Sequence, residues 1–190
     1  IGSTTMSAQI CDMNSGEVLA VSGMMNPQIR FGEDLMSRVS YGFMNEGGSE
    51  ELTKAVQNGL QELIEKASKQ EGLNVQDIFE IVLVGNPVMH HLVLGIDPVE
   101  LGGAPFALTL DTAVNCLAQE VGLRFNVATR VYLLPCIAGH VGADAAGAVL
   151  AEAPQNSEEI TLLIDIGTNA EIILGNCHHL MAACLLYTSP

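Results

Sequence analysis

Two short stretches, IGSTT at residues 1–5 and DIGTN at residues 165–169, repeat one pattern of an isoleucine, a glycine and a hydroxyl side chain. Each stretch lies where an apolar strand folds back on itself, and its glycine permits a tight backbone turn. Hydroxyl and amide groups on such a turn face one point, which suits an anion such as a polyphosphate. The repeat therefore predicts two loops that hold phosphate groups.

The composition is that of a folded, acidic protein. The chain has 190 residues, of which 48% are hydrophobic, so it can bury a substantial core in one or two compact units. Its 7 Lys and Arg stand against 22 Asp and Glu, and the formal net charge of -15 repels nucleic acid and anionic membrane surfaces. No apolar run approaches the roughly 20 residues that span a bilayer, and the first residues do not resemble a secretion signal. We therefore expect a cytoplasmic protein with neither nucleic acid nor a membrane as its partner.

The cysteines predict no metal or iron–sulfur site within this chain. They form no CxxC pair and have no spacing that gathers four thiolates on one short loop. Their odd number and their apolar neighbours indicate buried, reduced thiols instead. The cysteines are Cys11, Cys116, Cys136, Cys177 and Cys184.

Alternating strand and helix patterns follow the first loop. β-prone runs at residues 5–11 and 18–24 flank a group of turn formers, which predicts a hairpin. A long apolar stripe at helical spacing, with glutamates at its start and Gly72 beyond its end, predicts a helix over residues 50–69. A nearly continuous apolar run at residues 78–84 is typical of a strand buried on both faces of a parallel or mixed sheet.

The same signals assign the remaining segments. The other expected helices cover residues 35–43, a segment that opens at Pro87, residues 113–121 and the small-residue segment 139–148. The other expected strands cover residues 131–134, 161–165, 170–174 and 179–183, and the polar residues 152–159 mark a boundary. A strand pair with a glycine and hydroxyl loop thus occurs twice, which implies two like halves that face each other with a nucleotide between them. We assign residues 1–152 to the first half and residues 153–190 to the opening of the second.

The paired loops resemble the phosphate 1 and phosphate 2 motifs of the superfamily that contains actin, chaperone ATPases and sugar kinases. Residues 135–148 resemble the connecting helix of that superfamily. The resemblance implies an α/β, ribonuclease H-like fold of the actin and sugar-kinase type. The chain would comprise one full half and the opening β-strands of the second half.

Within that superfamily, four segments are similar to the ATPase domain of the reductive activators of corrinoid proteins. They are NPQIRFGED at residues 26–34, VGNPVMHH at 84–91, LPCIAG at 134–139 and DIGTNAE at 165–171. The resemblance implies a domain whose ATP binding accompanies the return of an inactive cobalt(II) corrinoid to cobalt(I). It also implies that a ferredoxin-like domain, outside this chain, carries the iron–sulfur cluster. The implied partners are ATP with Mg²⁺, a corrinoid protein of a methyltransferase system and, in a homodimer, a second copy.

The chain departs from the family pattern in two places. The family has an aspartate just before the position of Ile1, which would hold the metal-bound phosphates, and the sequence begins one residue after it. Residues 185–190 do not continue the expected glycine-rich stretch, and the segment that would bind adenosine lies beyond them. We therefore expect a partial cleft and weak or absent ATPase activity for these 190 residues alone.

The candidate site residues come from the two loops and from one helix. Asp165 is assigned to orient hydrated Mg²⁺, a hard cation that prefers carboxylate and water; the alternative is a carboxylate that only caps its turn. Asp144 is the second candidate catalytic residue, although an aspartate near a helix start more often stabilises the helix dipole. The expected donors to phosphate oxygens are Gly2, Ser3, Thr4 and Thr5 on one loop and Gly167, Thr168 and Asn169 on the other.

Other polar residues remain undecided at this point. Glu171 follows the second loop and could act in the site or not. His90 and His91 point to different sides of a helix, so we expect one to pack and the other to meet solvent or a partner. Arg30 is expected to pair with a nearby carboxylate or to reach a phosphate or partner, and His178 and His179 fit a hairpin turn better than a metal site.

Two other functions remain compatible with the sequence. One is a small-molecule kinase of the same superfamily, which is weakened because no acceptor aspartate of the sugar-kinase type is recognisable. The other is a docking or dimerisation module that has lost nucleotide binding.

Overall fold

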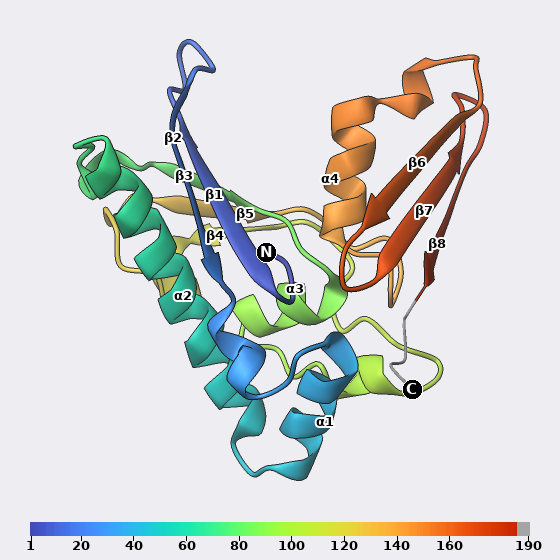
Figure 1. Ribbon diagram of the computed structural model, residues 1–190, viewed down its shortest axis with the longest axis horizontal. Helices are drawn as coiled ribbons and strands as arrows, with labels where there is room; N and C mark the ends of the chain where they lie inside the picture. Colours follow the sequence, from blue (N-terminus) through green and yellow to red (C-terminus); the bar gives the residue numbers. More distant parts are fainter. Residues whose placement is uncertain (186–190) are drawn as a thin grey trace.

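The chain begins with an antiparallel hairpin, as the sequence predicts. The computed structural model describes residues 1–185, so most of the tail that departs from the family pattern lies outside the described residues. β1 (Thr5–Cys11) pairs with β2 (Val18–Met25), and the Asp12 carboxylate holds the turn between them by accepting the amide protons of Asn14 and Ser15, each at 2.8 Å. The hairpin therefore extends directly from the first loop (Figure 1).

Two helices follow this hairpin, and both contribute residues to the main core. A 3₁₀ turn, η1 (Pro27–Arg30), leads into α1 (Leu35–Met44), where the side chain of Asp34 caps the helix start, and into α2 (Gly48–Gln70). The predicted short and long helices are confirmed. α2 packs on β1 and β2, and Gly59 permits the close approach, because a Cβ there would lie 2.8 Å from the methyl group of Met6.

The central sheet is mixed, with the strand order β3-β5-β4. β3 (Glu80–Leu83) is parallel to β5 (Arg130–Leu133), so the predicted mixed sheet is confirmed. The expectation that both faces of residues 78–84 are buried is wrong, because the side chains alternate. Ile81 and Leu83 face the core, whereas Val82 is 57% exposed.

The helix expected over residues 113–121 is also wrong. The segment forms β4 (Val114–Leu117), antiparallel to β5, followed by a single 3₁₀ turn, η4 (Ala118–Val121). Pairing with β5 outweighs the helical preference of the segment, and Arg130 adds a bond from its Nε to the side-chain oxygen of Asn115 at 2.7 Å. Tertiary pairing of this kind cannot be read from local spacing.

The short helix that opens at Pro87 is confirmed as α3 (Pro87–Val93), but both of its histidines are buried. The expectation that one of them meets solvent is therefore wrong. The His91 ring accepts from the Thr109 amide at 3.1 Å, since the loop around η3 (Val99–Gly102) folds over this side of the helix. A 3₁₀ turn, η2 (Val75–Asp77), connects α2 to β3.

The second group of elements is built on a three-stranded antiparallel sheet, β6-β7-β8. The predicted strands are confirmed as β6 (Thr161–Ile166), β7 (Ala170–Gly175) and β8 (Leu180–Leu185). They follow α4 (Ala143–Glu152) and the 3₁₀ turn η5 (Pro154–Asn156). α4 begins at Ala143, after the predicted start at residue 139, because residues 138–141 form a small bridged turn.

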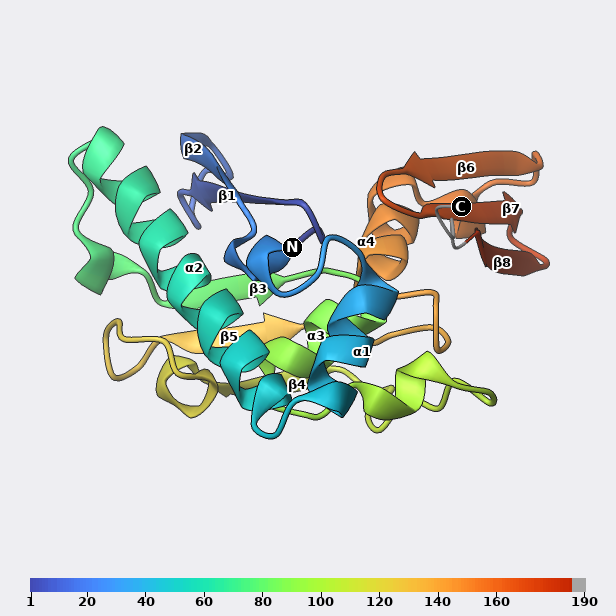
Figure 2. The same ribbon diagram turned by 60° about the horizontal axis from the view of Figure 1, so that its bottom comes forward.

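The two groups have separate hydrophobic clusters. The large cluster joins the hairpin, α1–α3 and the central sheet, and a small one joins α4 to β6–β8 through residues such as Ala145 and Ile173. Figures 1 and 2 show α4 with β6–β8 on one side of the molecule and β1–β5 with α2 on the other. A mixed α/β fold is thus confirmed, whereas its division at residue 152 stays a prediction. Among the described residues, no helix is long and apolar enough to cross a membrane.

The cysteines are only partly as expected. Cys136 is buried and Cys116 and Cys184 are half-buried, but Cys11 and Cys177 are exposed. The five described thiols are free. The expectation of uniformly buried thiols is wrong for the exposed pair, since both lie near strand ends, where turns meet solvent.

Candidate functional site

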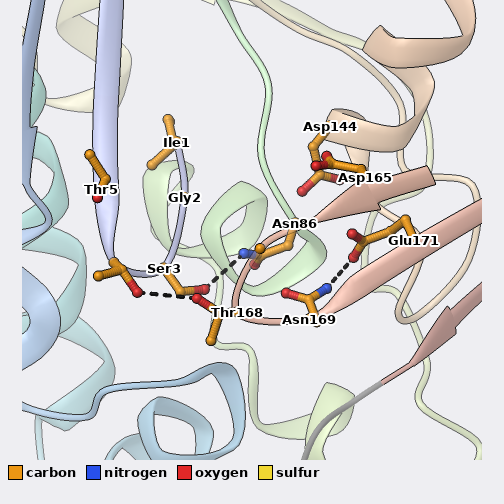
Figure 3. A pocket seen from close by; sticks show the side chains of 12 residues that line it. Ile1, Gly2, Ser3, Thr5, Asn86, Asp144, Asp165, Thr168, Asn169 and Glu171 are labelled. Carbon is orange, nitrogen blue, oxygen red and sulfur yellow. Dashed lines mark hydrogen bonds between the residues drawn. The ribbon is translucent and has the colours of Figure 1, made fainter.

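The two predicted loops line one cavity between the two groups of elements. Its volume is about 560 Å³, within the range of small-molecule sites. Figure 3 shows the first loop facing the second across this space. The lining residues are Ile1, Gly2, Ser3, Thr4, Thr5, Asn86, Asp144, Asp165, Gly167, Thr168, Asn169 and Glu171.

The loops also contact each other directly. The hydroxyl oxygen of Thr4 lies 3.1 Å from that of Thr168, and both side chains are exposed. Each loop is closed in a similar way, because the amide of Gly2 donates to the Thr5 carbonyl at 3.0 Å and the amide of Gly167 donates to the Asn169 carbonyl at 2.8 Å. Both loops are thus closed by the amide of their glycine, although the first bond reaches three residues along the chain and the second two. The two glycine amides already bond within their own loops, so the threonine hydroxyls are the more available donors.

The first loop is anchored to the start of α3. The Asn86 side chain caps this helix by accepting from the Met89 amide at 3.0 Å, and it donates to the hydroxyl of the buried Ser3 at 3.2 Å. Ser3 therefore positions the loop in this structure. Gly142 lets the start of α4 approach the same point, because a Cβ there would lie 2.6 Å from the Cα of Asn86.

A buried arginine, which was not predicted from the sequence, holds the backbone of the first loop on the side away from the cavity. Arg38 of α1 is fully buried, and its guanidinium donates to the carbonyl oxygens of Ser3 and Gly32 and to the side chain of Gln28. Burial lowers its pKa to about 10, against the opposing effect of Asp34. Arg30, which the sequence singled out, lies instead over the ring of Phe31 at 4.6 Å.

Three carboxylates face the cavity from α4, β6 and β7. Figure 3 shows Asp144 and Asp165 close together, with Glu171 beside them. Burial raises the pKa of Asp144, and the neighbouring Asp165 raises it further. Burial also raises the pKa of Glu171 to about 7, with a further contribution from the charge of Asp144. Glu171 is only 4% exposed and lines the cavity, a position that its place in the sequence left undecided.

The second loop continues into a short polar network. The Asn169 side chain donates to the carboxylate of Glu171, and the Cys184 thiol lies 3.5 Å from the same carboxylate. Burial raises the pKa of Cys184 to about 11, so this thiol stays protonated at neutral pH. The network fixes Glu171 at the inner wall of the cavity, next to the loop.

The charge of this cavity restricts its ligands. Of the described residues that line it, three are acidic and none is Lys or Arg. These carboxylates would repel a bare polyphosphate, whereas a divalent cation would offset the negative charge of both the carboxylates and the phosphates. Asp165 is exposed to the cavity, and its carboxylate is suited to bind Mg²⁺ either directly or through one of the waters bound to the ion. Among the described residues, the carboxylates of the cavity do not form a cluster of three close ligand atoms.

The structure therefore brings the predicted site residues together. The seven loop residues, Asp144 and Asp165 all line this same cavity. Ile1, Asn86 and Glu171 line it as well. Asn86 lies in the VGNPVMHH segment, but its hydrogen bond to Ser3 could not be predicted without the fold. Arg38 gave no signal in the sequence beyond the scarcity of cations.

Comparison with known proteins gives consistent results. The family model described as "RACo middle region" matches residues 1–156. The chain is 35% identical over 177 residues to "Corrinoid activation enzyme RamQ" of Eubacterium limosum, covering 93% of this chain and 30% of the relative. The solved structure of a "Reductive activator for corrinoid,iron-sulfur protein" matches with a TM-score of 0.94 and 39% identity, covering 97% of this chain and 29% of that one.

These matches confirm the resemblance carried by the four sequence segments. The chain spans about 30% of the length of these relatives, so it corresponds to one region of such a protein. The chain belongs to the family of the RACo middle region, a part of the reductive activators of corrinoid proteins.

Proposed function

We propose that this chain binds Mg²⁺-ATP in the cavity between its two loops, as the nucleotide-binding part of a corrinoid activator. One observation carries the proposal: loops 164 residues apart, with the same sequence pattern, line one cavity and contact each other through Thr4 and Thr168. Two such loops are suited to hold neighbouring phosphates of one ligand.

The size and charge of the cavity support a nucleotide that carries a cation. About 560 Å³ is enough for a triphosphate and its metal, and the three carboxylates favour the complex over the free anion. The bound Mg²⁺ would neutralise phosphate charge, and Asp165 would hold its hydration shell. Asp144 would assist Asp165, while Thr4, Thr5 and Thr168 would donate to phosphate oxygens.

The order of the elements also supports a specific fold for this chain. Each loop leads into an antiparallel strand, β1 after the first loop and β7 after the second, and α4 lies between the two units in the chain. This order supports an actin and sugar-kinase type ATPase of which the chain forms one half and the opening of the second. Closure around the nucleotide would then change the affinity for the corrinoid protein. Reduction of cobalt(II) to cobalt(I) would use an electron from an iron–sulfur domain outside this chain. A cytoplasmic location and a homodimer remain predictions.

Thermal unfolding of the full-length protein with ATP tests the proposal. A ligand at a hundredfold excess over its dissociation constant stabilises the bound state by about 2.7 kcal/mol, so Mg²⁺-ATP should raise the melting temperature clearly. ATP with EDTA should give a much smaller shift. An unchanged melting temperature with Mg²⁺-ATP would favour a docking module, and phosphoryl transfer to a small-molecule acceptor would favour a kinase.

A further inference from the structure

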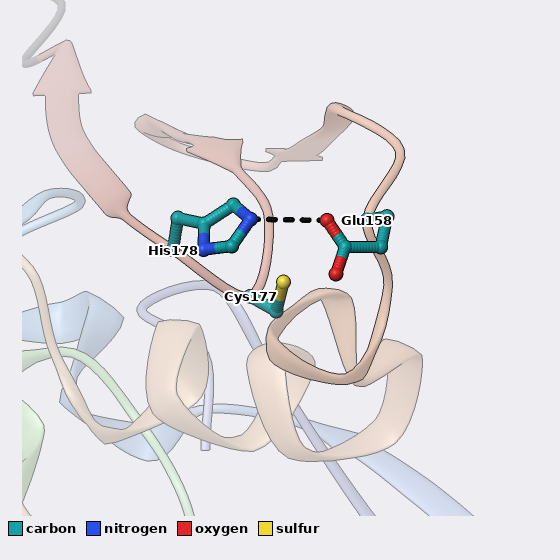
Figure 4. A group of neighbouring side chains, drawn as sticks. All are labelled: Glu158, Cys177 and His178. Atoms are coloured by element: carbon teal, nitrogen blue, oxygen red, sulfur yellow. Dashed lines mark hydrogen bonds and ion pairs between the residues drawn. The ribbon is translucent and has the colours of Figure 1, made fainter.

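A second group of potential metal ligands lies outside the cavity. The side chains of Glu158, Cys177 and His178 bring an oxygen, a sulfur and a nitrogen atom within 4.8 Å of one another (Figure 4). Among the described residues, this is the one set of three such groups that meets that distance. The histidine Nε2 lies 3.0 Å from a carboxylate oxygen of Glu158, and the two side chains are 72% and 82% exposed. A metal ion could therefore reach them directly from solvent.

Backbone contacts hold the two ligand-bearing segments together. The amide of Cys177 donates to the carbonyl of Ser157 at 2.8 Å, and the side chain of Asn176 donates to the carbonyl of Glu158 at 2.9 Å. The side-chain oxygen of Asn176 in turn accepts from the His178 amide at 3.0 Å. The relative position of the three ligands thus depends on fixed backbone, with Asn176 as the link between both segments.

The location separates this group from the nucleotide cavity. The turn between β7 and β8 carries the cysteine and the histidine, and the segment that leads into β6 carries the glutamate. Strand register pairs Thr161 with Gly175 at this end of the sheet and Ile166 with Ala170 at the other end, next to the second loop. The group therefore lies a full strand length from that loop.

The ligand types select among metals. Mg²⁺ and Ca²⁺ prefer oxygen ligands, whereas a set of thiolate, imidazole and carboxylate suits Zn²⁺. Sites with three protein ligands keep a fourth position for water. Binding would release the thiol proton and replace the present contact between His178 and Glu158.

We propose that Glu158, Cys177 and His178 form a Zn²⁺ site with water as the fourth ligand. The metal would clip the segment before β6 to the turn between β7 and β8. This inference is independent of the proposed nucleotide site. It also revises the expectation, drawn from cysteine spacing, that no metal site lies within the chain.

Zinc-edge X-ray absorption on tag-free, full-length protein tests the proposal. The protein is stripped with a chelator, given one equivalent of Zn²⁺ and desalted, and its spectrum is compared with that of Cys177→Ser. The element-specific signal is unaffected by iron. We expect the wild type to show one sulfur at about 2.3 Å and lighter ligands at about 2.0–2.1 Å, and Cys177→Ser to lose that sulfur together with one equivalent of zinc.

Matched variants sharpen the result. His178→Gln should also lose the metal, whereas Cys11→Ser and His179→Gln remove an exposed cysteine and the neighbouring histidine and should retain it. Asn176→Ala should weaken binding about tenfold or more, because it removes the residue that orients the ligands. Wild-type protein that retains no zinc, or Cys177→Ser protein that retains as much as the wild type, would overturn the proposal.

Discussion

The hydroxyl oxygens of Thr4 and Thr168 lie 3.1 Å apart, although 164 positions separate these residues in the chain. The contact joins the loop before β1 to the loop between β6 and β7, at the rim of the cavity. It is exposed, so its contribution to folding is small, and both hydroxyls can turn toward a ligand. The pair is therefore better suited to binding than to holding the fold together.

Removing either hydroxyl should separate binding from stability. Thr4→Val and Thr168→Val should each change the free energy of unfolding by less than about 1 kcal/mol, since the bond is exposed. Each should weaken Mg²⁺-ATP binding by about ten- to hundredfold, because a hydrogen bond to a charged group is worth about 1.5–3 kcal/mol. Urea unfolding and calorimetric titration measure the two effects. Thr161→Val, in β6 but outside the cavity, should leave affinity unchanged; equal affinities for all three variants would contradict this assignment.

Replacing the buried arginine should destabilise the first loop and the core together. Arg38→Met leaves the carbonyl oxygens of Ser3 and Gly32 without their donor, so we expect a loss of about 2–4 kcal/mol in the free energy of unfolding. Arg30→Met, the control, removes an exposed arginine and should change stability by about 0.5 kcal/mol or less. Similar denaturation midpoints for both variants would show that Arg38 does not support the loop.

The raised pKa of Glu171 predicts a pH-dependent cost to folding. In the unfolded chain this carboxyl ionises near its ordinary pKa of 4.5, whereas in the folded chain its pKa is about 7. The stability that it contributes at low pH is therefore lost as the pH rises through this window. Glu171→Gln should be more stable than the wild type at pH 8, by up to about 3 kcal/mol, and the difference should vanish near pH 4.5. A constant difference between the unfolding curves at all pH values would refute the shift.

The buried histidine pair predicts the opposite trend at acidic pH. Burial and, to a smaller extent, His91, whose ring centroid is 5.7 Å away, lower the pKa of His90 to about 4. The unfolded chain takes up a proton near pH 6.5, so stability should fall as the pH decreases from 6.5 to 4. His90→Gln should flatten this part of the profile, measured by urea midpoints. His179→Gln changes an exposed histidine and should keep the wild-type slope.

Much of the framework was predictable from the sequence because it rests on local patterns. The apolar stripe of α2 specifies a helix by its own spacing, and the β-prone runs around DIGTN specify strands that pair with their neighbours in sequence. The repeat of IGSTT and DIGTN also predicted which loops face each other, since it is a property of the whole chain. These features required no knowledge of tertiary packing.

The errors occurred where distant segments decide the outcome. Residues 114–117 become a strand because β5 is available to pair with them, and α4 starts late because residues 138–141 form a bridged turn. Burial of Arg38, Glu171 and both histidines follows from packing between segments that lie far apart in the sequence. The site was therefore predictable in its loops but not in the side chains that support them.

Titration calorimetry of the full-length protein and its Asp165→Ala variant shows whether the two loops bind one Mg²⁺-ATP. Glu62→Ala, which removes an exposed carboxylate on α2, is the matched control. We expect one Mg²⁺-dependent ATP site in the wild type and the control, and an affinity at least about tenfold weaker in Asp165→Ala. ATP binding of equal strength in all three proteins, or none in the wild type, would contradict this expectation.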